Sequence, residues 1–118
     1  LPDSAEFKDR AAATAVIEPI AKQLRGAQVT ATLTGTTADV GAKAGQVRLS
    51  EQRAQAVAAL LAGLGVPADR LTVIGRGSDF PGYLVDHDGS GNLIPAAAAR
   101  NRKVIIDLAG GSASGFCA

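Results

Sequence analysis

The chain has 118 residues, of which 47% are hydrophobic, 19% charged and only 3% aromatic, and its formal net charge at pH 7 is +1. This composition excludes an intrinsically disordered chain, because the apolar share is too high, and it excludes collagen and a coiled coil, because the 14 glycines are frequent and follow no repeat. No stretch approaches the roughly 20 apolar residues of a membrane span, and the near-zero charge argues against a nucleic-acid-binding protein. We therefore expect one small α/β or α+β domain rich in Ala and Gly.

The start of the sequence is typical of a piece cut from a longer protein, whereas the single cysteine near its end leaves the compartment open. The chain begins Leu1-Pro2-Asp3 with no initiator Met and no leader, so we expect a mature product or an excised domain. Cys117 is the only cysteine and lies in a Gly- and Ser-rich stretch that predicts a flexible tail. A single thiol forms no internal disulfide, so cysteine usage leaves the cellular compartment open.

The first half of the chain predicts a helix followed by a strand. An apolar stripe at helical spacing predicts a helix that ends at Gly26, and the stripe consists of Ala13, Val16, Ile17, Ile20, Ala21 and Leu24. Pro19 lies inside it, where a proline costs about 3 kcal/mol in a helix interior, so we expect a kink there. Residues 28–34 alternate apolar and polar side chains and predict a half-buried strand.

A glycine-rich loop and a second helix come next. Residues 35–48 contain three glycines and predict a loop. Ser50 has the character of an N-cap and Glu51 complements the helix dipole, so we expect the helix to begin there. Gly65 closes the predicted helix and Pro67 follows it. The predicted buried face consists of Ala54, Val57, Ala58, Leu61 and Leu64.

The second half predicts two short strands separated by irregular chain. Residues 71–74 and 103–108 have the apolar character of strands, residues 78–95 are broken by Pro and Gly, and residues 96–99 add one helical turn. The order of these elements predicts a two-layer α/β (α+β) sandwich, in which the helices pack on one face of a small mixed β-sheet.

Arg53 is the candidate binding residue that the helix prediction singles out. If Ser50 is the N-cap, Arg53 lies in the first turn, where a cation is disfavoured by roughly 0.3–1 kcal/mol unless a negative group compensates it. Together with Arg48 it forms a receptor for a carboxylate or phosphate. Asp39, in the preceding loop, would take an ammonium, so the pair suits a zwitterion. The alternative is an ordinary surface ion pair between Arg53 and an acid, which contributes little.

The segment 86–92 is similar to the first half of a calcium loop. Asp86, Asp88, Ser90 and Asn92 place oxygen ligands at alternate positions around a glycine. Ala97 stands where such a loop needs a bidentate Glu. The simpler alternative is a polar turn, with His87 as a solvated side chain.

The sequence carries no pattern of an enzyme. The glycines around residue 64 follow a helix, whereas a dinucleotide fingerprint follows a strand. The chain also has no serine in a nucleophile elbow, no plausible Cys–His pair and no cluster with metal-ligand spacing. We expect neither catalysis nor a cofactor.

Several short motifs fall in one order along the chain. They are the stretches 35–37, 49–57, 65–71 and 75–77, then Pro81 and residues 101–104. With these motifs the sequence resembles the OmpA C-terminal-like family of peptidoglycan-associating domains, from about Asp3 to Leu108. The resemblance implies an OmpA-like βα-βαβ domain over residues 1–108, whose first strand lies upstream of Leu1, followed by a tail over residues 109–118.

In that family an Asp and an Arg hold the diaminopimelate zwitterion of the peptidoglycan stem peptide. The Arg falls on Arg53. An ungapped alignment places Ala38 at the position of the Asp, with Asp39 one residue later, and Gln46 replaces the family's Asn. The site that the resemblance implies consists of Asp39, Arg53, Thr37, Gln46 and Arg102.

The resemblance implies a non-catalytic module outside the cytoplasm that tethers an exported or membrane-anchored envelope protein to the cell wall. Its expected partner is the stem peptide of peptidoglycan, with envelope or secretion proteins as further partners. Two alternatives remain. One is a protein-interaction or assembly domain of the same fold with a degenerate site, which Ala38 favours. The other is a calcium-regulated module built on Asp86 and Asp88.

Overall fold

The computed structural model describes residues 10–26 and 29–110 of the chain. The elements in chain order are α1 (Arg10–Gly26), β1 (Val29–Gly35), α2 (Lys43–Gly63), the 3-10 helix η1 (Ala68–Arg70), β2 (Leu71–Gly75), α3 (Pro95–Asn101) and β3 (Val104–Gly110). Residues 1–9, where the family resemblance begins, and residues 111–118 of the predicted tail, which include Cys117, lie outside the described residues. The predicted order of helices and strands is confirmed.

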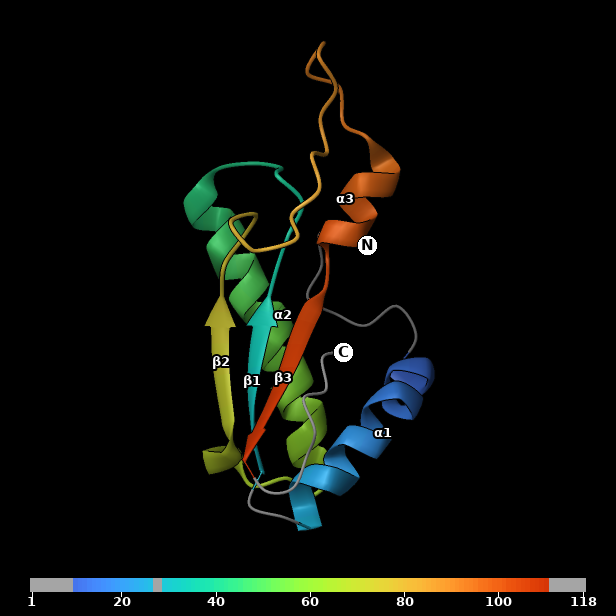
Figure 1. Ribbon diagram of the computed structural model, residues 1–118, viewed down its shortest axis with the longest axis vertical. Helices are drawn as coiled ribbons and strands as arrows, with labels where there is room; N and C mark the ends of the chain where they lie inside the picture. Colours follow the sequence, from blue (N-terminus) through green and yellow to red (C-terminus); the bar gives the residue numbers. More distant parts are fainter. Residues whose placement is uncertain (1–9, 27–28, 111–118) are drawn as a thin grey trace.

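The strands form a mixed sheet with β1 at its centre (Figure 1). β1 pairs in parallel with β2, from Ala31 opposite Leu71 to Gly35 opposite Gly75. It pairs antiparallel with β3, which continues to Gly110 and so includes two residues that we assigned to the tail. The carboxyl ends of the parallel strands β1 and β2 therefore meet at one end of the sheet.

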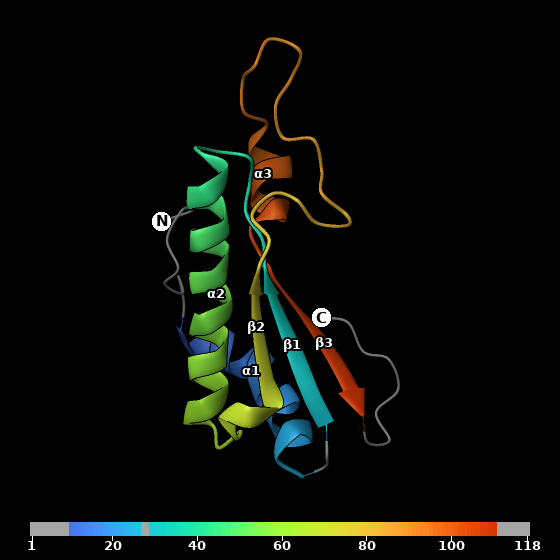
Figure 2. The same ribbon diagram turned by 90° about the vertical axis from the view of Figure 1, so that its left-hand side faces the viewer.

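The two long helices cover one face of the sheet, as predicted (Figure 2). Side chains along β1 alternate between buried and less buried, so its apolar residues face the helices and its threonines face away. Leu24 of α1, Leu33 of β1 and Leu61 of α2 have no exposed surface and lie in this core. Burying a leucine fully contributes about 1.5–3 kcal/mol, so this interface holds the two layers together.

The prediction that the second helix begins at Ser50 is wrong. α2 begins at Lys43, and Ser50 is a buried residue within it. The Ser50 hydroxyl donates to the Val47 carbonyl and accepts the backbone N–H of Gly77. Residues 43–48 were predicted as loop because they include Gly45 and show no apolar stripe. They are helical because α2 extends past the end of the sheet, where it packs against the chain that leaves β2.

Two glycines allow α2 to pass close to the strand ends. A Cβ atom on Gly35 would lie 1.7 Å from the Ser50 carbonyl oxygen, and a Cβ atom on Gly75 would lie 2.6 Å from the Val47 carbonyl oxygen. No side chain fits at either position. The close approach places the first two turns of α2 beside the loops that follow β1 and β2.

Two further differences concern the helices. α1 is helical on both sides of Pro19, and Val16 of its predicted apolar stripe is 66% exposed. α3 spans Pro95–Asn101, longer than the single turn predicted, with Pro95 in the first turn where its missing N–H is tolerated. Within the part of the chain that the structure describes, none of the helices combines the length and apolar character needed to cross a membrane.

Candidate functional site

Polar side chains gather where the parallel strands end. Thr36 and Thr37 follow β1, and Ser78 follows β2, and all three are buried. The backbone N–H of Thr37 donates to the Gly77 carbonyl at 2.8 Å, which joins the two chain segments. Open sheets with parallel strands bind their ligands at this end, so the candidate site lies here, beside the start of α2 and near α3 (Figure 1).

The buried side chain of Arg53 supports the loop that follows β1. It lies ten residues after Lys43, which is the first residue of α2, so it is not in the first turn as predicted. Its side chain is buried, and Nη1 donates to the Thr36 carbonyl at 3.0 Å. The Thr36 hydroxyl donates in turn to the Asn101 carbonyl at 2.7 Å. The guanidinium therefore holds the loop and is not displayed at a helix N-terminus.

Asp39 presents a carboxylate on that loop. One of its oxygens, Oδ1, accepts hydrogen bonds from Gln46 Nε2 and from Lys43 Nζ, each at 2.9 Å. The hydrogen bond from Gln46 has the largest effect on the pKa of Asp39, followed by the one from Lys43, and together they hold it below its ordinary value of 3.8. The side chain is 39% exposed, so an ionised carboxylate faces solvent. Asp39 and Gln46, predicted as site residues, are in direct contact.

Lys43 and Ser78 complete this polar network and were missed by the sequence analysis. Lys43 Nζ also donates to the Ser78 hydroxyl at 2.9 Å, and that hydroxyl donates to Gln46 Oε1 at 2.5 Å. Lys43 lies at the start of α2, where the helix dipole disfavours a cation by roughly 0.3–1 kcal/mol. No side chain caps this end and the first turn carries no acid, so the compensating negative charge comes from Asp39.

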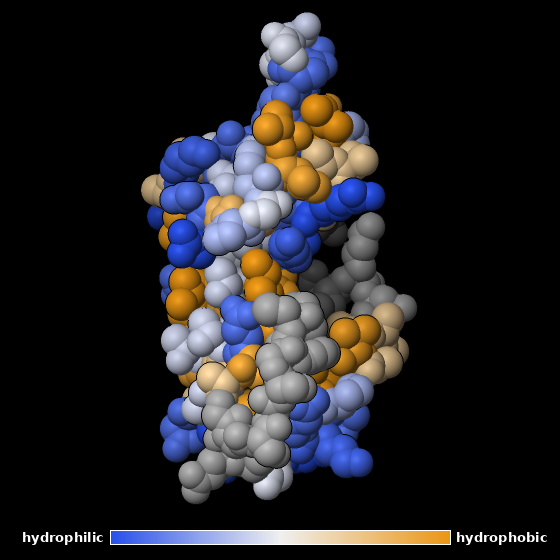
Figure 3. Space-filling model, viewed as in Figure 1, coloured by the Kyte–Doolittle hydropathy of each residue, from blue (hydrophilic) through white to orange (hydrophobic). Residues whose placement is uncertain are grey.

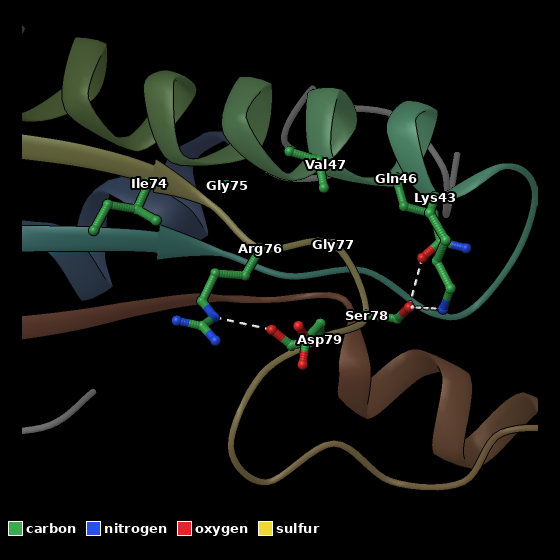
Figure 4. Close-up of a pocket in the computed structure, with 9 residues that line it drawn as sticks. All are labelled: Lys43, Gln46, Val47, Ile74, Gly75, Arg76, Gly77, Ser78 and Asp79. Carbon is green, nitrogen blue, oxygen red and sulfur yellow. Dashed lines mark hydrogen bonds between the residues drawn. The ribbon is translucent and has the colours of Figure 1, made fainter.

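A cavity of about 750 Å³ opens beside the network, between α2 and the end of β2 (Figure 4). Lys43, Gln46 and Ser78 converge at one end of it, and Ile74 lies at the other, with Val47 between them. The remaining lining residues are Gly75, at the end of β2, and Arg76, Gly77 and Asp79, in the chain that leaves it. The cavity therefore joins a charged, hydrogen-bonding end to an apolar end.

The other predicted site residues surround the same loop. Thr37 is 3% exposed, and no described residue hydrogen-bonds to its hydroxyl. Arg102 is partly buried and lies between Asn101 and Lys103, whose carbonyls both accept the Thr36 hydroxyl. Tertiary structure thus brings the predicted set to one end of the sheet, either on the Asp39 network or around Thr36.

Asp86 is a fully buried carboxylate that ties this end of the domain together. Its Oδ2 accepts the backbone N–H of Asp39 and the Asn101 amide, and its Oδ1 accepts the Tyr83 hydroxyl and interacts with His87 Nδ1. Burial raises the pKa of Asp86, but these hydrogen bonds together outweigh it, so its pKa lies below 3.8. Burial and the hydrogen bond to Asp86 raise the pKa of Tyr83 to about 12.

The residues of the predicted calcium loop already make hydrogen bonds within the domain. Asp88 is exposed, and its Oδ1 accepts the backbone N–H groups of Ser90 and Asn92, which is the pattern of a hydrogen-bonded turn. Asp86 instead points into the domain. Asp39, Asp86 and His87 do place ligand atoms within 4.8 Å of one another. However, hydrogen-bond donors already occupy both oxygens of Asp86.

An exposed apolar patch lies at the same end of the molecule. Figure 3 shows hydrophobic atoms gathered just below the tip, over the segment that precedes α3. The large apolar residues exposed in this segment are Leu84, Val85, Leu93 and Ile94.

Known proteins share both sequence features and the fold of this chain. The OmpA family model matches residues 1–92 of the chain. The fold is similar to the peptidoglycan-associated lipoprotein from Burkholderia pseudomallei, with 24% identity and a TM-score of 0.75, over 91% of this chain and 84% of that one. It is also similar to the C-terminal domain of Helicobacter pylori MotB, with 23% identity and a TM-score of 0.71, over 95% of this chain and 81% of that one.

A third similar structure is the OmpA-like domain of FopA1 from Francisella tularensis, with 21% identity and a TM-score of 0.60, over 91% of this chain and 65% of that one. No curated protein sequence matches the chain. At these identities the solved structures establish the fold alone, whereas the family model spans well over half of the sequence. The chain is therefore a member of the OmpA family.

Proposed function

We propose that this domain is a non-catalytic peptidoglycan-binding module that tethers an exported or envelope protein to the cell wall from outside the cytoplasm. Membership of the OmpA family supports the proposal, as does the likeness in fold to a lipoprotein that is described as peptidoglycan-associated. The observation that carries it is the ionised, partly exposed carboxylate of Asp39 at the carboxyl end of the parallel strands.

The ligand that fits this chemistry is a stem peptide of the diaminopimelate type. Its side chain ends in an ammonium and a carboxylate on one carbon, and Asp39 would accept the ammonium. Gln46 fixes the Asp39 carboxylate, and Thr37 and Arg102 would line the approach. Arg53 adds positive charge behind Thr36, which favours the carboxylate of the ligand.

Co-sedimentation with purified peptidoglycan tests the proposal. We expect the wild-type chain to pellet with it, and Asp39→Asn to bind about tenfold more weakly because a charge-assisted hydrogen bond is lost. Asp69→Asn is the matched control, since Asp69 is an exposed acid in η1, before β2 begins. Failure of the wild-type chain to pellet would overturn the proposal.

An NMR titration with a soluble muropeptide locates the site. We expect the largest amide shifts in residues 36–50 and 76–79, which surround the Asp39 network, and none in η1. Unchanged resonances in residues 36–50 at millimolar ligand would count against binding at this place.

A second candidate function is protein interaction or assembly with a degenerate peptidoglycan site. Two observations favour it. Ala38 is 2% exposed and stands where the family resemblance implies an acid, and the apolar patch of Leu84, Val85, Leu93 and Ile94 is exposed at the same end. This function predicts no pelleting with peptidoglycan, together with a stable complex with a purified envelope protein that Val85→Glu abolishes.

A further inference from the structure

The accessible cation beside the Asp39 carboxylate is Lys43, whereas Arg53 is buried. The Lys43 side chain is 72% exposed, and its Nζ lies 2.9 Å from Asp39 Oδ1. The Arg53 residue is 9% exposed and donates to a backbone carbonyl. A ligand that arrives from solvent therefore meets a carboxylate and an ammonium side by side before it meets the guanidinium.

Both members of this pair retain capacity for further hydrogen bonds. An ammonium has three N–H donors, and Lys43 directs two of them to Asp39 and Ser78. Asp39 accepts both of its bonds on Oδ1, and no described residue donates to its Oδ2. An exposed ion pair of this kind is weak in water. A zwitterion can replace it by an exchange of partners, with the ligand ammonium on Asp39 and the ligand carboxylate on Lys43.

The cavity between α2 and β2 would take the aliphatic part of such a ligand. Lys43 and Gln46 lie at its polar end, and Val47 and Ile74, which are 42% and 41% exposed, provide apolar walls (Figure 4). A side chain with a methylene chain and a terminal α-amino acid group matches this order of surfaces. Lysine, which has the ammonium without the carboxylate, would leave Lys43 without an anionic partner.

We propose that Lys43, and not Arg53, receives the ligand carboxylate, so that the Asp39–Lys43 pair makes the site selective for a side chain ending in a zwitterion. This inference rests on the proposed function, because it assumes that the stem peptide binds at Asp39. It makes Lys43 a specificity-determining residue contributed by the first turn of α2.

The experiment compares two soluble muropeptides, one carrying diaminopimelate and the other carrying lysine at the same position, by calorimetry or NMR titration. We expect the wild-type chain to prefer the diaminopimelate form by about tenfold, the effect of one charge-assisted contact. Lys43→Met should remove this preference, and Lys43→Arg should restore it. Lys22→Met, an exposed position on α1, is the control and should leave the preference unchanged.

The ratio of the two affinities separates this inference from a structural role of Lys43, because loss of folding weakens both ligands equally. If Lys43→Met retains the preference while Arg53→Lys loses it, the inference is overturned and the proposed function stands. If the wild-type chain binds both ligands equally, the selectivity inference fails alone. If it binds neither, the proposed function fails and this inference with it.

Discussion

The backbone N–H of Asp39 donates to Oδ2 of the fully buried Asp86 at 2.9 Å, which joins the loop after β1 to the long segment after β2. The same oxygen accepts the Asn101 amide, so α3 is held at the same point. A buried carboxylate that accepts hydrogen bonds from several segments of the chain thus positions the loop that presents the candidate ligand-binding side chain. This relationship makes the candidate site depend on residues that no ligand needs to touch.

Asp86→Ala should destabilise the domain by about 3 kcal/mol, because it removes the acceptor of the Asp39 N–H and of the Tyr83 hydroxyl, and one of the two acceptors of the Asn101 amide. Denaturant unfolding followed by circular dichroism measures the change. The matched control is Asp88→Ala, at an exposed position in the same segment, which should cost much less. Equal losses for the two variants would show that Asp86 does not organise this end of the domain.

The single tyrosine gives a direct spectroscopic readout of the same cluster. The chain has one tyrosine, Tyr83, and no tryptophan. Its pKa is raised from 10.0 to about 12 by burial and by the hydrogen bond to Asp86. The tyrosinate absorbance should therefore rise with a midpoint near pH 12, and Asp86→Asn should lower this midpoint. A wild-type midpoint near 10.0 would mean that the Tyr83–Asp86 contact is not present in solution.

Acid should destabilise the domain through Asp39 and Asp86. Both pKa values lie below 3.8 in the folded state. Hydrogen bonds from Gln46 and Lys43 lower the pKa of Asp39. Burial raises the pKa of Asp86, but the hydrogen bonds that its carboxylate accepts outweigh this effect. The ionised forms therefore contribute stability above pH 3.8, and this contribution is lost as the pH falls through the folded pKa values. The free energy of unfolding, measured as a function of pH, should therefore decrease as the pH falls below 3.8. The decrease should be shallower in Asp86→Asn.

Gly35→Ala should be severely destabilising, by about 4 kcal/mol or more, because the new Cβ would lie 1.7 Å from the Ser50 carbonyl oxygen and force α2 away from β1. Gly45→Ala is the matched substitution in α2, where a Cβ meets nothing within 4 Å. It should stabilise the helix by about 0.5–1 kcal/mol. Thermal or urea unfolding distinguishes the two, and similar stabilities would contradict the close packing described for Gly35.

The fold could be predicted largely from local patterns. The alternation from Val29 to Thr34 indicated the central strand, and the stripe from Ala54 to Leu61 indicated the buried face of α2. The start of α2 was predicted eight residues too late, with Ser50 as the N-cap in place of Ala42, because Ser50 and Glu51 imitate a helix cap. No local signal shows that Ser50 instead accepts a hydrogen bond from Gly77, which is 27 residues away.

Some residues of the candidate site could likewise be predicted from the sequence, whereas others could not. Asp39 was predicted from its place in the loop before the second helix, and Gln46 from the family resemblance, and the two side chains are in direct contact. Lys43 was missed because the segment containing it was predicted as loop, and Asp86 was interpreted as a ligand in a turn. Ser78 carried no signal of its own, and Asn101 entered only as part of the family-like stretch 101–104, because their partners Gln46 and Asp86 are distant in sequence.

The sequence by itself determined the kind, order and layering of the elements, because burial of apolar residues at helical or strand spacing is a local property. Only the tertiary structure decided which groups meet at the end of the sheet. It buried Arg53 beneath Thr36, paired Asp39 with Lys43, and enclosed Asp86 among donors. The physical reason is that a polar side chain takes its role from whichever distant donors and acceptors the packing of α2 and α3 brings within hydrogen-bonding distance.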